Sequence, residues 1–246
     1  MKILVLIYRS LIAYLGITLN GLIGSILYLI SFGRLRRWNA EVLTPFFGKW
    51  ILKLIGIEAV LPDSSQIPAG PVMYIFNHNS FLDIFLLPML KLPNTVPLLS
   101  TRTRKIIPLY LANLGMGAKF IPFKDRPEAR LGFLKALSKW LERKEASLVC
   151  APEGVHRFRH GIGKFNRGIF HAAMESRTTI APLFFKIPKE SNPLETHSFR
   201  NGRVEVSVLP PISTANWTVE TLDEEIQRIR NIYVQKFNQE FQAGIQ

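Results

Sequence analysis

The chain has 246 residues, a size that fits one domain with an appendage, and a net charge of +13 with a pI of 10.1. Its single cysteine, Cys150, excludes an internal disulfide framework, and its place in an apolar run indicates a packing role. The charge indicates an anionic partner, which leaves nucleic acid, acidic lipid and a phosphorylated substrate as candidates.

The N-terminal segment discriminates among these partners. From Leu11 to Phe32 there is no charged residue. As a helix this stretch would be roughly 33 Å long, enough to cross a bilayer core of about 30 Å. Arg34, Arg36 and Arg37 follow, and the positive-inside tendency places the downstream chain on the cytoplasmic side. We therefore expect a membrane protein with anionic lipid as a partner; whether the segment spans the bilayer or embeds in one leaflet stays open.

A second apolar segment, residues 42–57, carries Lys49 and Lys53 and has an amphipathic pattern. It fits a helix that lies along the membrane surface with its lysines toward anionic headgroups. It fits equally well an ordinary helix packed on the domain. Residues 1–57 are therefore predicted to form a membrane-associated helical region, and residues 58–246 to form the main domain.

Strand and helix patterns alternate after this region. The predicted strands are residues 58–61, 72–76, 96–100, 119–121, 147–151, 179–185 and 204–209. The predicted helices are residues 82–90, 108–114, 127–144, 168–177 and 219–242. This alternation predicts an α/β layered domain with a mostly parallel sheet flanked by helices. In such sheets, functional sites gather at the carboxyl ends of the strands.

His78 and Asp83 follow the second predicted strand, five positions apart. On one continuous helix such residues lie about 140° apart around the axis and cannot touch. If His78 lies in the turn and Asp83 in the first helical turn, the carboxylate can reach the imidazole. It would fix the tautomer and leave the other ring nitrogen to take a proton. The alternative is that Ser80 caps the helix and Asp83 completes a capping box.

Three further blocks follow in order. Pro152-Glu153-Gly154-Val155-His156-Arg157 follows a predicted strand, then come residues 164–168, and Ala181-Pro182-Leu183 lies in another apolar run. This order resembles the glycerolipid acyltransferase family, typified by 1-acylglycerol-3-phosphate acyltransferase. That family has an Asn-His-x-x-x-x-Asp block, a Phe-Ile-x-Arg block, a Pro-Glu-Gly-Thr-Arg block and a short block centred on proline. The resemblance covers about residues 70–190.

The resemblance implies acyl transfer without a covalent enzyme intermediate. His78 would act as general base on a lipid hydroxyl that attacks the thioester of acyl-CoA or acyl carrier protein, and Asp83 would orient it. No metal and no bound cofactor would be needed. Glu153 and Gly154 would shape the acceptor site, and Lys105, which matches a family lysine, would bind phosphate. The basic residues that flank the motifs suit phosphate binding, and the substrate-binding set is completed by Lys124, Arg157 and Lys164.

Two departures from the family pattern concern the acceptor. The second block corresponds to Phe120-Ile121-Pro122-Phe123, so Phe123 stands where the family has arginine, with Lys124 beside it. Val155-His156 stands where the third block has Thr-Arg, with Arg157 one place later. Lysophosphatidic acid is the first expectation for the acceptor, and another lysolipid is the alternative. A catalytically silent membrane tether is the rival from a different class, and the retention of both His78 and Asp83 argues against it.

Other chemistries lack their motifs. There is no Gly-x-Ser-x-Gly elbow and no phosphate loop ending in Gly-Lys-Ser or Gly-Lys-Thr. His156 and His160 have the spacing of a helical metal pair, but Arg157 and Arg159 lie between them and no carboxylate follows, so zinc is not expected. Nucleic-acid binding is disfavoured because the N-terminus is apolar and no reading module is recognisable.

Overall fold

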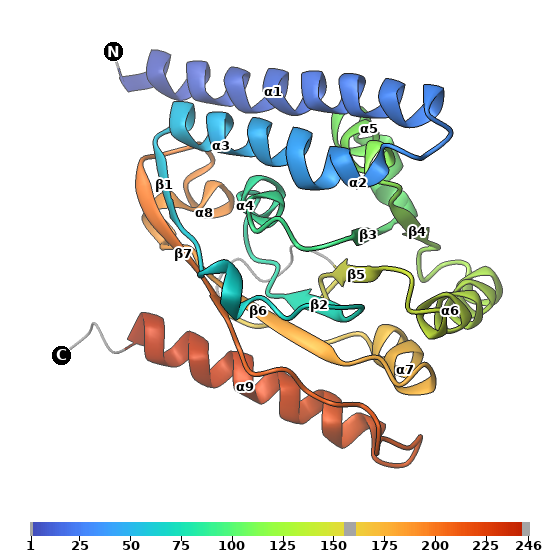
Figure 1. The fold of residues 1–246 in the computed structure, drawn as a ribbon. Helices are drawn as coiled ribbons and strands as arrows, with labels where there is room; N and C mark the ends of the chain where they lie inside the picture. Colours follow the sequence, from blue (N-terminus) through green and yellow to red (C-terminus); the bar gives the residue numbers. More distant parts are fainter. Residues whose placement is uncertain (1, 155–160, 243–246) are drawn as a thin grey trace.

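One seven-stranded sheet forms the centre of the protein (Figure 1). The computed structural model describes residues 2–154 and 161–242. The strand order is β1-β7-β6-β2-β5-β3-β4, and every neighbouring pair is parallel except β6 and β7. The strands are β1 (Ile57–Val60), β2 (Met73–Phe76), β3 (Thr95–Ser100), β4 (Lys119–Ile121), β5 (Ser147–Cys150), β6 (Ile180–Lys186) and β7 (Gly202–Val208). The predicted α/β class with a mostly parallel sheet is confirmed.

Helices precede the sheet and alternate with its strands. They are α1 (Lys2–Ile30), α2 (Arg36–Trp38), α3 (Thr44–Ile55), α4 (Asp83–Met89), α5 (Ile107–Gly115), α6 (Pro127–Glu142), α7 (Arg167–Glu175), α8 (Pro193–Thr196) and α9 (Leu222–Gln242). The first helix begins well before the charge-free stretch that the sequence singles out, and it includes Arg9. The Arg9 guanidinium donates a hydrogen bond of 3.5 Å to the carbonyl of Phe199, so this charge lies against the domain.

Both faces of the sheet are covered, and the side chains of β2 alternate between them. Met73 and Ile75 belong to the core that contains residues of α6, α7 and α9. Tyr74 and Phe76 belong to the core that contains residues of α1, α3 and α4. All four residues are at most 7% exposed, as expected for a central strand of a parallel sheet. The strand ends that carry the candidate site are therefore held between two packed layers (Figure 1).

Close backbone contact holds α1 along the domain. A side chain at Gly115 of α5 would place its Cβ 2.6 Å from the backbone of Gly24 in α1, so only glycine fits there. Asn39 completes the contact, because its Nδ2 donates to the carbonyls of Gly24 (2.9 Å) and Gly115 (2.8 Å). Helix α1 is thus tied to α5 by packing and by hydrogen bonds.

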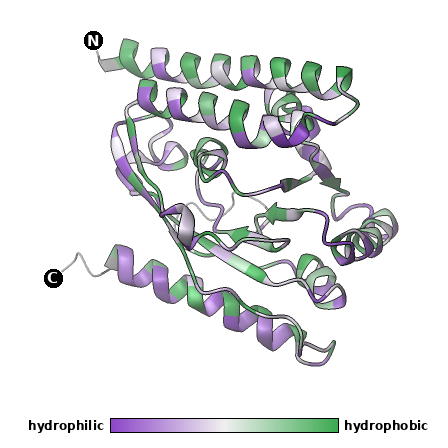
Figure 2. Cartoon of the chain, in the orientation of Figure 1, coloured by the Kyte–Doolittle hydropathy of each residue, from purple (hydrophilic) through white to green (hydrophobic). Residues whose placement is uncertain are grey.

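The opposite side of α1 is apolar and exposed, as is one side of α3 (Figure 2). We call this surface the apolar face, and its side chains include Tyr14, Leu15, Leu19, Leu22, Ile26, Leu29, Phe46, Trp50 and Leu54. Among the described residues, one helical stretch, residues 3–30, is long and apolar enough to cross a membrane. Within residues 42–57, helix α3 packs on the domain through Ile51, Leu52 and Ile55, while its opposite side is apolar and exposed. Contact of that side with a membrane surface stays a prediction.

Candidate active site

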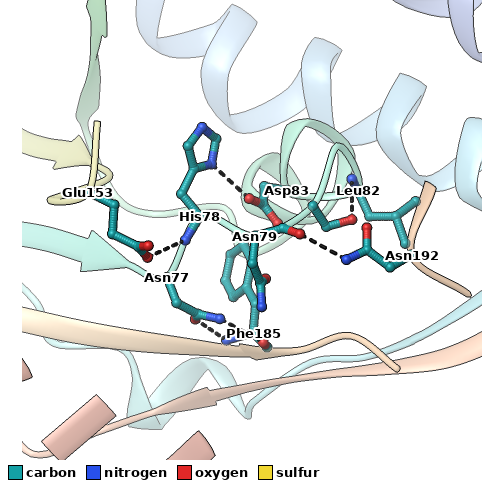
Figure 3. Close-up of polar contacts among 9 residues, drawn as sticks. Asn77, His78, Asn79, Leu82, Asp83, Glu153, Phe185 and Asn192 are labelled. Atoms are coloured by element: carbon teal, nitrogen blue, oxygen red, sulfur yellow. Dashed lines mark hydrogen bonds and ion pairs between the residues drawn. The ribbon is translucent and has the colours of Figure 1, made fainter. Parts of the chain in front are cut away.

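His78 and Asp83 form a hydrogen-bonded pair at the carboxyl end of β2 (Figure 3). His78 lies in the turn, and Asp83 is the first residue of α4. The His78 Nδ1 lies 2.8 Å from Asp83 Oδ2. The predicted approach of carboxylate to imidazole is therefore observed. Ser80 does not form the alternative capping box as the helix N-cap; its Oγ accepts the N–H of Leu82, which itself precedes the helix.

Glu153 joins this loop from β5, the strand beside β2. One carboxylate oxygen, Oε1, accepts the backbone N–H of His78 at 3.1 Å, and the other, Oε2, accepts the N–H of Gly163 at 2.8 Å. The side chain is only 4% exposed. Glu153 thus fixes the backbone of His78 in addition to any contact with an acceptor.

Asparagines fix the remaining backbone around the pair. Asn77 makes two hydrogen bonds with the backbone of Phe185 on β6, through its Oδ1 (2.8 Å) and its Nδ2 (2.9 Å). Asn192 donates from Nδ2 to the carbonyl of Asn79 at 2.8 Å. The turn between β2 and α4 is therefore held from both sides (Figure 3), which preorganises the pair.

A glycine is required beside Glu153. Gly154 has a φ of +73°, and a Cβ there would lie 2.9 Å from Nδ2 of Asn166. The same Nδ2 donates to the carbonyls of Pro152 and Glu153, both at 2.8 Å. The Pro-Glu-Gly turn is thus shaped by Asn166 at the start of α7.

Burial controls the protonation of His78. It lowers the pKa of the imidazole to about 4, because an apolar environment disfavours the charged ring. The ring is therefore neutral near pH 7. With Nδ1 donating its proton to Asp83, the lone pair is on Nε2, which points away from Asp83 (Figure 3). The side chain is 20% exposed, so the arrangement suits a general base.

The pKa of Glu153 is raised, chiefly by burial and also by the charge of Asp83. The two accepted N–H groups and the positive charge of Arg230 oppose this shift. Burial outweighs these opposing effects, so the pKa of Glu153 lies above its usual value.

The predicted phosphate-binding lysines all follow strands whose carboxyl ends lie at the same edge of the sheet as the end of β2. Lys105 follows β3, Lys124 follows β4 and Lys164 follows β5, and all three are exposed. Since β2, β3, β4 and β5 are parallel, their carboxyl ends meet at one edge. A shallow pocket of about 360 Å³ opens there, lined by Lys124, Pro127, Arg130, Leu131, Leu134, Asn166, Arg167 and Gly168. The arrangement offers positive charge beside the Pro-Glu-Gly turn.

Phe123, the first departure from the family pattern, supports an arginine from elsewhere in the chain. The guanidinium carbon of Arg102, which follows β3, lies 3.2 Å from the centre of the Phe123 ring. Positive charge is therefore present beside this position although it comes from a different segment. His156 and Arg157, which concern the second departure, lie outside the described residues.

No role is predicted from the sequence for Asn77, Asn166 or Asn192. Asn77 lies within the Asn-His block and Asn166 within residues 164–168, and side chains of this type commonly bond to nearby backbone. Asn192 carries no comparable local signal. No group of three or more histidine, cysteine, aspartate or glutamate side chains with metal-binding geometry occurs in the two described ranges.

The comparisons with known proteins agree with this geometry. A family model described as Acyltransferase matches residues 59–186. A 1-acyl-sn-glycerol-3-phosphate acyltransferase of Limnanthes alba is 30% identical over 193 residues, which cover 76% of this chain and 66% of that protein. One of Escherichia coli is 24% identical over 194 residues, which cover 79% of this chain and 75% of that protein. The chain thus spans a little under two thirds of the length of the plant relative.

A solved structure shows the same fold. It is the 1-acyl-sn-glycerophosphate (LPA) acyltransferase PlsC from Thermotoga maritima, with a TM-score of 0.71 and 18% sequence identity. The match covers 95% of this chain and 96% of that one. The similarity therefore includes the N-terminal helices as well as the sheet.

Proposed function

Because the chain belongs to the acyltransferase family, we propose that it transfers an acyl group from a thioester to the hydroxyl of 1-acylglycerol-3-phosphate, giving phosphatidic acid. The observation that carries the proposal is the 2.8 Å contact between His78 Nδ1 and Asp83 Oδ2, in a turn that Glu153 and Asn77 hold in place. The acceptor hydroxyl is only weakly acidic, so it needs a positioned base at neutral pH, and the His78–Asp83 pair supplies one.

The proposed mechanism proceeds in two steps. Nε2 of His78 takes the proton of the acceptor hydroxyl while its oxygen attacks the thioester carbonyl, and Asp83 stabilises the resulting imidazolium. The tetrahedral intermediate then collapses: the C–S bond breaks, and the imidazolium returns its proton to the leaving thiolate. The products are an ester and a free thiol, so the reaction requires no metal and no bound cofactor; acyl-CoA or acyl carrier protein is a co-substrate.

A phosphomonoester acceptor suits the charges at the site edge. Lys105, Lys124 and Lys164 are exposed there, and Arg102 lies over the ring of Phe123. Guanidinium and ammonium groups bind phosphate through charge-assisted hydrogen bonds. Relatives named as 1-acyl-sn-glycerol-3-phosphate acyltransferases support the same acceptor. We place Arg157 in the phosphate-binding set as well, on the family pattern alone.

An acyl-transfer assay on the purified full chain tests the proposal. The acceptors are 1-acylglycerol-3-phosphate, 1-acylglycerophosphocholine and 1-acylglycerophosphoethanolamine, each with acyl-CoA and with acyl carrier protein as donor. Free thiol is followed by colorimetry and the lipid product by mass spectrometry. We expect kcat/KM to be at least roughly tenfold higher for 1-acylglycerol-3-phosphate, the equivalent of one bidentate phosphate contact. Faster transfer to another lysolipid would reassign the acceptor, and no transfer to any acceptor would contradict the function.

We also propose that the apolar face of α1 and α3 binds the bilayer, with the catalytic domain on the cytoplasmic side and anionic lipid attracted by the basic residues. Exposed apolar side chains gather on two helices that contact each other, α1 and α3, and large exposed apolar patches mark membrane or protein interaction sites. An enzyme bound to the bilayer in this way can take its lipid acceptor from the same membrane.

Trp50→Glu tests the membrane proposal. Trp50 is 45% exposed on the apolar face. We expect the variant to bind phosphatidylcholine–phosphatidylglycerol vesicles roughly tenfold more weakly in flotation, because a large apolar side chain contributes about 1.5–3 kcal/mol on burial. Val219→Glu, at an apolar residue that is 53% exposed just before α9, is the matched control and should bind like wild type. Equal loss in both variants would assign membrane binding to overall charge instead.

A further inference from the structure

Arg230 in the C-terminal helix α9 is connected to His78 through three hydrogen-bonded links. Its Nε donates to the carbonyl of Gly163 and its Nη2 to that of Ile162, both at 2.8 Å. The N–H of Gly163 donates to Glu153 Oε2, and Glu153 Oε1 accepts the N–H of His78. The guanidinium thus fixes the peptide that fixes Glu153, which in turn fixes the backbone of His78.

The guanidinium suits this position better than another cation would. It presents two N–H groups in a fixed, planar arrangement, and here each meets one of two consecutive carbonyls. The neighbouring turn of α9 makes a second contact near the site: the hydroxyl of Tyr233 donates to the carbonyl of Ile75 on β2, the strand that precedes His78, at 2.9 Å. Helix α9 therefore holds both the Ile162–Gly163 peptide and β2, from the opposite face of the sheet to α4.

Arg230 also acts on the charge of Glu153. The titratable groups around that carboxylate are Asp83 from α4, which raises its pKa, and Arg230 from α9, which lowers it; Tyr233 also faces it from α9. Ionised Glu153 accepts both N–H groups, whereas a protonated carboxyl loses one acceptor site. The positive charge of Arg230 therefore favours the form of Glu153 that holds both links.

We propose that Arg230 is a positioning residue for acyl transfer, which places His78 by holding the Ile162–Gly163 peptide and, through it, Glu153. It does not contact substrate; it acts through Glu153. The kinetic part of this inference rests on the proposed acyltransferase function, whereas the state of Glu153 can be measured independently of any activity.

Two substitutions separate the geometry from the charge. Arg230→Met removes both, and Arg230→Lys keeps a positive charge but loses the paired donors. We expect Arg230→Met to lower kcat roughly ten- to hundredfold with KM for both substrates within about twofold, since a small misplacement of a catalytic group costs up to about that factor. Arg230→Lys should lose less. Arg228→Met is the matched control on the same helix, because Arg228 pairs with Glu225 at the surface and should leave kcat unchanged.

The carboxyl carbon of Glu153, followed by NMR during a pH titration of the detergent-solubilised full chain, gives a readout that does not depend on turnover. We expect the pKa of Glu153 to rise in Arg230→Met and to stay near the wild-type value in Arg230→Lys and Arg228→Met. A kcat loss in Arg230→Met together with that rise supports the proposal. An unchanged kcat in a folded Arg230→Met, or a loss confined to KM or to melting temperature, overturns it. If wild type transfers no acyl group, the proposed acyltransferase function is wrong. The positioning role of Arg230 is tested separately, and an unshifted pKa of Glu153 in Arg230→Met overturns it.

Discussion

Replacing His78 with alanine is expected to lower kcat for acyl transfer by roughly 100- to 10,000-fold, the usual contribution of a positioned general base. The imidazole is the group whose Nε2 lone pair can take the acceptor proton, since its Nδ1 is engaged with Asp83. KM for the acyl donor should change little because the substitution removes no binding charge. The measurement is thiol release under saturating acceptor, with the variant shown to be folded by its melting temperature.

His171→Ala is the control for this substitution. His171 lies on α7, where its side chain is 38% exposed and pairs with Glu175 across one helical turn. Its removal should leave kcat within about twofold of wild type, as for an ordinary surface change. Near-normal turnover by folded His78→Ala would exclude the proposed base.

The same variant has a second expected effect, on stability as a function of pH. Burial lowers the pKa of His78 to about 4, below the value of about 6.5 in an unfolded chain. Between these two values the unfolded state binds more protons, so His78 reduces the stability of the folded protein as pH falls. Melting temperature should therefore fall more steeply between pH 6.5 and 4 in wild type than in His78→Ala. Parallel curves would mean that the ring titrates normally in the folded protein.

Asp83→Asn should also lower kcat by roughly 100- to 10,000-fold, because an amide cannot stabilise the imidazolium and can donate to Nδ1 instead. Donation to Nδ1 places the ring proton on Nε2, where the lone pair is required. Asp83 is 2% exposed, so solvent cannot substitute for its charge. KM for both substrates should remain close to wild type.

Asp223→Asn is the matched control, since Asp223 lies in the first turn of α9 and is 72% exposed. An acidic residue in a first helical turn stabilises the helix by about 0.3–1 kcal/mol, so both substitutions remove that contribution. If Asp83→Asn lowers only the melting temperature, as Asp223→Asn should, then Asp83 serves the helix terminus and not the reaction.

The local sequence pattern was sufficient to predict the fold class and the contact between His78 and Asp83. Strand and helix periods are set by neighbouring residues, and the pair lies within a single turn, so geometry over a few residues decides it. The start of α1 was harder to predict because Arg9 interrupts the apolar pattern, and its partner, the carbonyl of Phe199, is close only in the folded chain.

The links that hold the site are distant in sequence. Glu153 meets the backbone of His78 only because β5 lies beside β2, and Arg230 meets Gly163 only because α9 returns across the sheet. Neither residue has a local pattern that identifies its partner. A glutamate after an apolar strand predicts a position at the site edge, whereas its role as a backbone acceptor depends on strand order.

The pairing of β1 with β7 constrains the order in which the protein can fold. Ile57, at the start of the sheet, lies opposite Gly202, which belongs to the last strand of the chain. At roughly 5–20 residues per second, synthesis of the intervening chain takes on the order of ten seconds. Throughout that interval β1 has no strand partner, whereas α4 and α5, on which α3 and α1 pack, are synthesised well before β7. The N-terminal helices can therefore meet the domain before the sheet is complete, and we expect the β1–β7 edge to be the last part of the sheet to form.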